Sequence, residues 1–213
     1  MDKIGKFFSL LADIVRYRVA VNQFIKFRNS GRHAFSGSVL AEELPFLQEL
    51  VDLSVQHKGP IVEIGTLYGF TTQHIAAYKR LDQELITVDN FSWNPIGLAE
   101  EAHRDFCLRS LYYLTKCANT TIYDGSGTSF YSSYDGETPA LVFIDANHAY
   151  EGVREDIDWA VSRGVPIICG HDYSEAFPGV KRAVNESFPD KFRVSGSLWA
   201  YVAEAQEVVA PMS

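Results

Sequence analysis

Hydrophobic residues along the chain form two kinds of pattern, short apolar runs and longer stretches in which apolar positions recur at helical spacing. Short runs bounded by Gly, Pro, Asp or Asn are typical of buried strands, and the helical spacing predicts helices between them. The predicted strands are Ile61–Ile64, Leu85–Asp89, Thr121–Tyr123, Leu141–Asp145 and Val165–Cys169. The predicted helices are Leu40–Gln56, Thr71–Leu81, Ala99–Cys117, Val153–Arg163 and a last one from Gly179 to Phe188.

Strands that alternate with helices predict β-α-β units, whose strands run parallel and whose crossovers are right-handed. Two further strands, Phe192–Val194 and Leu198–Val202, are separated only by Ser195–Ser197. So short a connection cannot hold a crossover, so this pair is predicted to be antiparallel. The predicted fold is therefore α/β: a doubly wound, mostly parallel, seven-stranded Rossmann-like sheet whose last strand is antiparallel, with N-terminal helices.

The first 33 residues differ from the rest in charge. They carry seven Lys and Arg against two Asp, so the remainder of this chain of net charge −8 carries −13. Their apolar residues recur at helical spacing, which predicts an amphipathic helix with a basic face. It could lie on a membrane surface, cover an active site, pack on a second subunit or dock on its own domain. We expect residues 1–39 to form a helical lid or homodimer contact, and residues 40–213 to carry the chemistry.

Composition limits the class of protein. With 213 residues, of which 46% are apolar, the chain can form one domain with a substantial core. No apolar run approaches the roughly 18 residues that a transmembrane helix requires, and we expect no secretory signal. Three cysteines that neither pair evenly nor cluster predict the reducing cytoplasm. The acidic body argues against nucleic acid as a partner.

Acidic and polar residues follow the end of every predicted parallel strand. Ligands of such sheets bind at the carboxyl ends of the strands, so we expect these residues to meet in one crevice. They are Glu63–Gly69, Asp89 and Asn90, Asp124–Ser126, Asp145–His148 and Gly170–Asp172.

The first β-α-β unit indicates which cofactor this crevice binds. Gly65 and Gly69 fall one glycine short of the G-x-G-x-x-G pattern of dinucleotide enzymes. Glu63, in an otherwise apolar strand, needs a partner and offers an acceptor to an amine. Asp89 ends the second strand, where a ribose would present two hydroxyls. These features favour a ligand with an α-amino group, a sulfonium and an adenosine.

Four segments carry a family resemblance: V-E-I-G-T-L-Y-G-F-T-T, I-T-V-D-N, V-F-I-D-A-N-H-A-Y-E-G-V and C-G-H-D-Y-S-E-A-F-P-G-V-K-R-A-V. In this order they resemble the class I S-adenosylmethionine-dependent methyltransferases, and more closely the small O-methyltransferases that include the macrocin type. The resemblance covers roughly residues 40–203. It implies an enzyme that methylates an oxygen of a small polar acceptor, such as a sugar or a polyhydroxylated natural product.

The resemblance also implies roles for individual residues. The methionine part of S-adenosylmethionine would bind the loop after the first strand, and the ribose would bind Asp89 and Asn90. Asp124, Gly125 and Ser126 would border the adenine, and Asp145 and Ala146 would lie beneath the sulfonium. The loop residues expected to bind cofactor are Glu63, Gly65, Thr66, Tyr68, Gly69 and Thr71.

Relatives of this type often bind Mg²⁺ through positions that correspond to Asp145, His171 and Asp172. Such a cation could hold two vicinal acceptor oxygens and lower the pKa of the one to be methylated. Because imidazole suits softer ions than Mg²⁺, the histidine leaves Mn²⁺, Fe²⁺, Zn²⁺ or no metal as alternatives.

The proton acceptor is also open at this point. His148 follows Asp145 by three residues and suits a base of near-neutral pKa, but it could instead cap the helix that begins around Glu151. The candidate catalytic residues are Asp145, His148 and His171, of which the sequence favours a structural role for His148 and a site role for His171. Two other functions remain: a relative of the cephalosporin hydroxylases, and a module that binds the cofactor without turnover.

Overall fold

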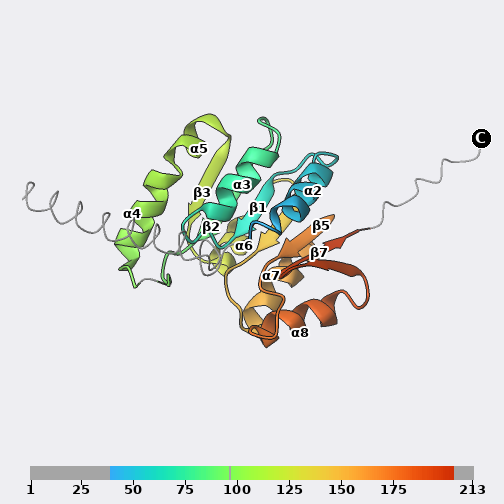
Figure 1. Ribbon diagram of the computed structural model, residues 1–213. Coiled ribbons are helices and arrows are strands. Elements are labelled where there is room, and N and C mark those ends of the chain that lie inside the picture. Colours follow the sequence, from blue (N-terminus) through green and yellow to red (C-terminus); the bar gives the residue numbers. More distant parts are fainter. Residues whose placement is uncertain (1–38, 96, 204–213) are drawn as a thin grey trace, which may run out of the picture.

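A computed structural model describes residues 39–95 and 97–203, which form a three-layer α/β domain (Figure 1). The predicted N-terminal lid or dimer segment lies outside these residues. The central sheet has seven strands in the order β3-β2-β1-β4-β5-β7-β6. Its strands are β1 Ile61–Ile64, β2 Leu85–Asp89, β3 Thr120–Asp124, β4 Leu141–Ile144, β5 Ile167–Gly170, β6 Phe192–Ser195 and β7 Leu198–Val202.

The strand pairing confirms the predicted sheet. β1 pairs in parallel with β2 and β4, and the parallel set continues to β3 on one side and β5 on the other. β7 is antiparallel to both β5 and β6. The order of strands reverses between β1 and β4, so their carboxyl ends diverge into helices on opposite sides and leave a crevice there.

Helices cover both faces of the sheet. Val62 and Ile64 of β1 pack on the face covered by α6, α7 and α8, whereas Ile61 packs on the face covered by α2 and α3. This alternation follows from the two-residue period of a strand. The helices are α2 Leu44–Ser54, α3 Phe70–Tyr78, α4 Glu100–Ser110, α5 Tyr112–Cys117, α6 Gly127–Ser133, α7 Tyr150–Ser162 and α8 Pro178–Ser187. None of the described helices is long and apolar enough to cross a membrane.

Two helices differ from the prediction. The helix predicted over Ala99–Cys117 is broken at Leu111, whose backbone leaves the helical region at φ −97° and ψ 1°. Leu111 is fully buried, and its side chain fills the space where a side chain at Gly69 would lie. Packing between these two segments, which no local pattern records, explains the break.

Helix α6 was not predicted. Its sequence, GTSFYSS, has one apolar position that is buried, Phe130, and consists otherwise of weak helix formers. Ser126 caps its first turn by accepting a hydrogen bond from the Ser129 amide at 3.1 Å. A polar seven-residue helix held by one cap and one buried ring gives no amphipathic signal.

Candidate functional site

A cleft of about 520 Å³ opens at the carboxyl ends of the parallel strands. Each of the first four strands contributes the residues that follow it, as the sequence predicted. The predicted site residues that line the cleft are Gly65 after β1, Asp89 at the end of β2 and Asn90 after it, Gly125 and Ser126 after β3, and Asp145, Ala146 and His148 after β4.

Gly65 allows the floor of this cleft to form. Its φ of +101° lies in a region that residues with side chains rarely adopt, and a Cβ atom there would lie 2.1 Å from the Asp145 carbonyl oxygen. The chain after β1 therefore runs directly against the chain after β4. Only glycine permits this approach, which brings the loop of the first unit next to Asp145.

Glu63 does not line the cleft. As the third residue of β1 it points to the face covered by α3, and it is fully buried. Its Oε2 accepts hydrogen bonds from the Thr72 and Thr87 hydroxyls, both at 2.6 Å. The Thr87 hydroxyl also lies 2.6 Å from that of Thr66. Glu63 was expected to have a hydrogen-bonding partner, and that partner is a row of threonine hydroxyls that leads to the glycine loop.

Burial raises the pKa of Glu63 to about 8, against the opposing effect of the two threonine hydrogen bonds. At neutral pH the side chain is therefore a carboxylic acid rather than an anion. Its Oε1 is buried and has no hydrogen-bond partner among the described residues.

Asp89 shapes the loop that follows β1. Its Oδ2 accepts hydrogen bonds from the Thr66 and Leu67 amides at 2.9 and 2.8 Å, and its Oδ1 accepts one from the Phe91 amide at 2.7 Å. A carboxylate has about four acceptor positions, so about one remains for a ligand. Asp89 therefore acts first as the support of two loops, and it retains less capacity for a ribose than the sequence suggested.

Several predicted cofactor residues support the cleft from behind. Tyr68 is buried, and its ring packs edge-on against His103 and Phe106. Gly69 forms the N-cap of α3 with a φ of +76°. Asp124 points away to form an ion pair with Arg104, with 2.8 Å between Oδ2 and Nε. Those that do not line the cleft are Glu63, Thr66, Tyr68, Gly69, Thr71 and Asp124.

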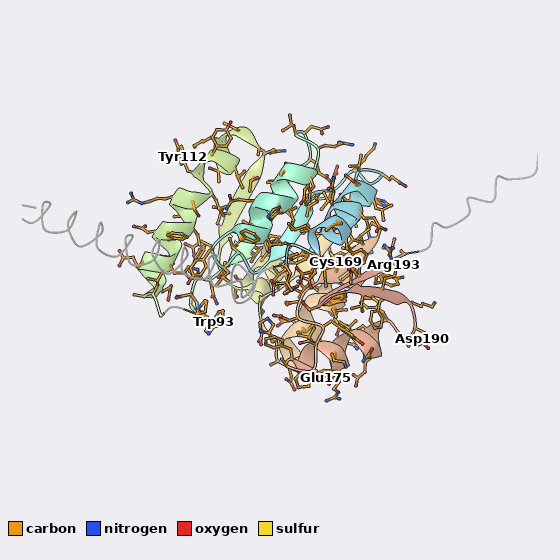
Figure 2. The ribbon with its side chains drawn as sticks, in the orientation of Figure 1. Trp93, Tyr112, Cys169, Glu175, Asp190 and Arg193 are labelled. Carbon is orange, nitrogen blue, oxygen red and sulfur yellow. The ribbon has the colours of Figure 1, made fainter. Side chains whose placement is uncertain are left out.

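Other residues that line the cleft are not among those that the sequence assigned to the site. Trp93, labelled in Figure 2, lines the cleft and is 62% exposed. Glu155 and Asp156 of α7 reach the cleft from the opposite side, where Glu155 accepts a hydrogen bond from Thr128 at 2.9 Å. The two acids are neighbours on a predicted helix, and no local pattern indicated that they reach the cleft beside α6, which lies two elements earlier in the chain.

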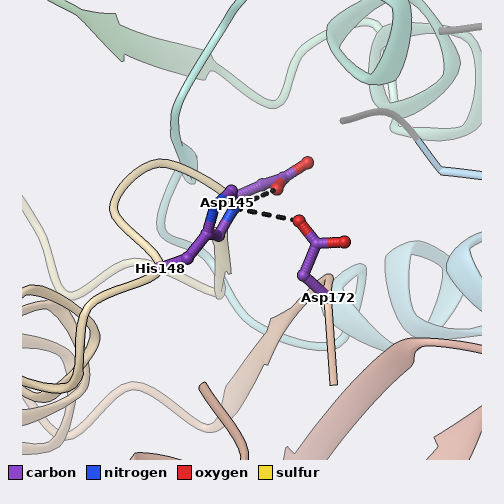
Figure 3. A group of neighbouring side chains, drawn as sticks. All are labelled: Asp145, His148 and Asp172. Carbon is purple, nitrogen blue, oxygen red and sulfur yellow. Dashed lines mark ion pairs between the residues drawn. The ribbon is translucent and has the colours of Figure 1, made fainter. Parts of the chain in front are cut away.

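The second half of the site is a cluster of Asp145, His148 and Asp172 (Figure 3). His148 Nε2 lies 2.9 Å from Asp172 Oδ2 and 3.7 Å from Asp145 Oδ1. Burial disfavours the charged form of His148, but its contacts with the two carboxylates outweigh this and raise its pKa to about 9. Burial raises the pKa of Asp145, and the two neighbouring histidines hold the pKa of Asp172 well below its usual range.

This cluster has the donor set of a divalent metal site. One ligand atom from each residue lies within 4.8 Å of the others. His148 Nε2 and Asp172 Oδ2 are buried and close, yet they lack the alignment of a hydrogen bond. Two carboxylates and one imidazole suit Mn²⁺ or Zn²⁺ better than Mg²⁺. The residues present therefore fit such an ion.

His171 borders this cluster from the side of α2 and contacts only Asp172 of its members. Its Nε2 lies 2.9 Å from both Glu43 Oε2 and Ser197 Oγ, and its Nδ1 lies 3.4 Å from Asp172 Oδ1. It does not line the cleft. The structure thus brings Asp145 and Asp172 together as expected, but it places His148 with them where the sequence favoured His171.

The structure shows no capping role for His148. Helix α7 has Ala149 at its N-cap and no side-chain cap, and the Ala149 amide donates instead to Asn147 Oδ1 at 2.9 Å. The structural alternative for His148, a helix cap, is therefore absent. Its side chain lies in the cleft wall with Asp145, and it contacts Asp172 behind that wall.

A family model described as a methyltransferase domain matches residues 62–173, slightly more than half of the chain. Two solved structures illustrate the similarity in fold. An O-methyltransferase from Bacillus cereus in complex with S-adenosylhomocysteine has a TM-score of 0.60 at 19% identity, and the match covers 91% of this chain and 90% of that one. The O-methyltransferase TomG from Streptomyces achromogenes, involved in tomaymycin synthesis and solved with S-adenosylmethionine, has a TM-score of 0.58 at 16% identity, with 79% and 82% covered. No curated protein sequence matches the chain.

Proposed function

The chain belongs to the methyltransferase-domain family, and from that premise we propose that it transfers the methyl group of S-adenosylmethionine to an oxygen of a small polar acceptor. The observation that carries the proposal is the cleft itself. A glycine turn after β1, a carboxylate after β2 and a Gly-Ser turn after β3 line one end, and an Asp-His-Asp cluster borders the other. One end suits a nucleoside and the other suits the reacting atoms.

We place the cofactor along the strand ends. Gly125 and Ser126 would hold the adenine, Asn90 and the free acceptor position of Asp89 would hold the ribose, and Gly65 and Asp145 would border the sulfonium. The carboxylate of Asp145 complements the positive sulfur. Glu63 contributes indirectly, because its threonine row ends on Thr66 of the loop that would hold the methionine part.

The protein contributes orientation and proton transfer. We assign the base to His148, because it lines the cleft and His171 does not. His148 Nε2 accepts the proton of the acceptor hydroxyl while an oxygen lone pair forms the new C–O bond. The C–S bond breaks, and its electron pair stays on sulfur to give neutral S-adenosylhomocysteine. Asp145 and Asp172 stabilise the imidazolium that results.

A divalent cation is the alternative means of activating the acceptor. Asp145, His148 and Asp172 would hold it, and when bound it would lower the pKa of the acceptor hydroxyl. The cation and the His148 base exclude each other, because both use the lone pair of the same ring nitrogen. Added Mn²⁺ should therefore inhibit methyl transfer if His148 is the base, and activate it if the cation is required.

The charge of the cleft favours an acceptor that is not anionic. Among the described residues that line it, four are carboxylic acids, His148 is the one basic side chain, and none is Lys or Arg. A phosphorylated acceptor would need cationic donors. A neutral or amino-bearing sugar, or a polyhydroxylated natural product, fits this surface better.

Two measurements test the proposal. Calorimetry should show that the purified protein binds S-adenosylmethionine, and incubation with a panel of hydroxylated acceptors should release S-adenosylhomocysteine. Failure to bind the cofactor would overturn the proposal. Binding without product for any acceptor would favour a cofactor-binding module, and an oxidised product would favour the hydroxylase-like relative.

The N-terminal segment remains a proposal of its own. We propose that residues 1–39 cover the cleft or join two copies of the chain, residues 40–213 form the catalytic domain, and the protein acts in the cytoplasm. Light scattering of the full chain and of a chain that starts at residue 39 should give different masses if the segment forms a dimer. Equal masses with weaker acceptor binding would indicate a lid.

A further inference from the structure

We propose that Glu43 is a positioning residue of this site, which acts through His171 to hold Asp172 against His148. This inference rests on the proposed function, because it concerns the acceptor end of the same cleft. Glu43 precedes α2, far from the strand ends in sequence, and it does not line the cleft. Its role follows from its burial, its partners and the backbone of the residue that it supports.

Glu43 is a fully buried carboxylate with an unusually complete set of partners. Its Oε1 accepts hydrogen bonds from the Ser197 amide at 2.5 Å and the Ser197 hydroxyl at 2.9 Å. Its Oε2 accepts from the Leu40 amide at 2.7 Å and from His171 Nε2 at 2.9 Å. The four donors come from the segment before α2, the β6–β7 turn and the residue after β5, so Glu43 joins three segments behind the site.

His171 connects Glu43 to the cleft wall. His171 directly follows β5 and continues the alternation of Ile167 and Cys169, which turns its side chain toward the face of α2 and Glu43. One ring nitrogen of His171 contacts Glu43, and the other lies 3.4 Å from Asp172 Oδ1. The second contact lacks hydrogen-bond alignment, so it is an electrostatic contact between an imidazole and a carboxylate.

The backbone of Asp172 directs its two carboxylate oxygens to different partners. Its φ is +61°, in the left-handed region that Asp and Asn adopt more readily than other residues with side chains. This conformation presents Oδ2 to His148 at 2.9 Å, while Oδ1 faces His171. The result is a row of alternating acids and imidazoles, in the order Glu43, His171, Asp172, His148, Asp145.

Stability alone does not account for Glu43. A buried ion pair contributes little net stability compared with apolar side chains of similar size, because removing two charges from water costs about as much as they regain. The Glu43 side chain does not cap α2 either. A charged residue at this position is explained if its charge, relayed by His171, keeps Asp172 in one orientation.

The test compares three variants of the full chain. Glu43→Gln removes the charge and keeps an amide oxygen for Ser197. The double variant Glu43→Gln/His171→Leu removes both charges, so it leaves no unpaired ion if the single variant fails to fold. Lys79→Met is the control for lost stability, because Lys79 is also a buried charge, with its Nζ 2.7 Å from the Gln83 and Ala118 carbonyls, away from the cleft.

Crystal structures and two binding measurements decide the matter. In the Glu43 variants we expect Asp172 Oδ2 to leave His148 Nε2, to a separation beyond about 3.5 Å. Mn²⁺ affinity, measured by electron paramagnetic resonance, should fall at least about tenfold, while S-adenosylmethionine affinity, measured by calorimetry, stays within about twofold. Lys79→Met should change neither the separation nor either affinity.

If the Asp172–His148 contact is unchanged in both Glu43 variants, the inference is overturned. This holds even if Mn²⁺ binds neither to the variants nor to the unaltered protein. Equal loss of the contact in Lys79→Met would overturn it too, because general destabilisation would then suffice. If the unaltered protein does not bind S-adenosylmethionine, the proposed function fails instead. The two failures are therefore distinguishable.

Discussion

The two ends of the cleft use their carboxyl groups differently. At the nucleoside end, Glu63 and Asp89 accept hydrogen bonds from threonine hydroxyls and backbone amides. At the acceptor end, Asp145 and Asp172 contact imidazoles. Acids of the same type thus build a loop at one end and an ionic cluster at the other. The comparison suggests that cofactor binding depends on backbone geometry, whereas catalysis depends on charge.

The largest expected effect lies at the acceptor end. His148→Gln should lower kcat by about 10²- to 10⁴-fold, the usual contribution of a general base. Steady-state kinetics with a responsive acceptor measures this change, and calorimetry should show nearly unchanged affinity for S-adenosylmethionine. A variant that loses cofactor affinity as well would break the division between the two ends.

At the nucleoside end, the matching change is Gly65→Ala. The added Cβ would lie 2.1 Å from the Asp145 carbonyl oxygen, and the φ of +101° is unfavourable for alanine. We expect a loss of roughly 2–4 kcal/mol in the free energy of unfolding and a weaker cofactor. Urea denaturation measures the first and calorimetry the second. Normal stability with normal affinity would mean that the chains after β1 and β4 do not approach each other in this way.

In metal-free protein, the acceptor end should also make a pH-dependent contribution to the free energy of unfolding. The pKa of His148 is raised from 6.5 to about 9, so its stabilising contribution is complete below pH 6.5 and is lost as the pH rises through 9. Methyl transfer should change in the opposite direction over the same range, because the base must lose its proton. Urea denaturation between pH 6 and pH 10, with chelator present, should show a smaller decline for His148→Gln. An equal decline in both proteins would argue against the ion pairs in Figure 3.

Glu63→Gln should have the smallest effect on methyl transfer. The pKa of Glu63 is raised from 4.5 to about 8, so the folded protein binds its proton more tightly and stability falls as the pH rises from 4.5 through 8. An amide cannot ionise, so the variant should lack this decline. Below about pH 4.5 we expect a change within about 1 kcal/mol, because both side chains are then neutral in the folded and the unfolded chain. At neutral pH the variant should be the more stable protein, because Glu63 is ionised there in the unfolded chain and an amide is not. A large loss at pH 6 would show that the acid has a role beyond its hydrogen bonds to threonine.

Much of the lining of the cleft could be predicted because it is local. Gly65, Asp89, Gly125 and Ser126 directly follow or end strands, and parallel strands bring their carboxyl ends together whatever the loops contain. Glu63 and His171 were assigned to the site, yet both face the helices on the α2 and α3 side. The two-residue period of β1 already predicted the direction of Glu63. The period of β5, extended by one residue, predicted that of His171.

The sequence by itself determined the sheet, the polar residues at the end of each parallel strand, and the family. Strand alternation, glycine spacing and the acids at strand ends are all properties of neighbouring residues. Only the tertiary structure decided which histidine joins Asp145 and Asp172. That choice depends on contacts of His171 with Glu43 and Ser197, which lie 128 and 26 residues away, and on the left-handed backbone of Asp172. Such contacts form only when packing brings distant segments together, so no local pattern encodes them.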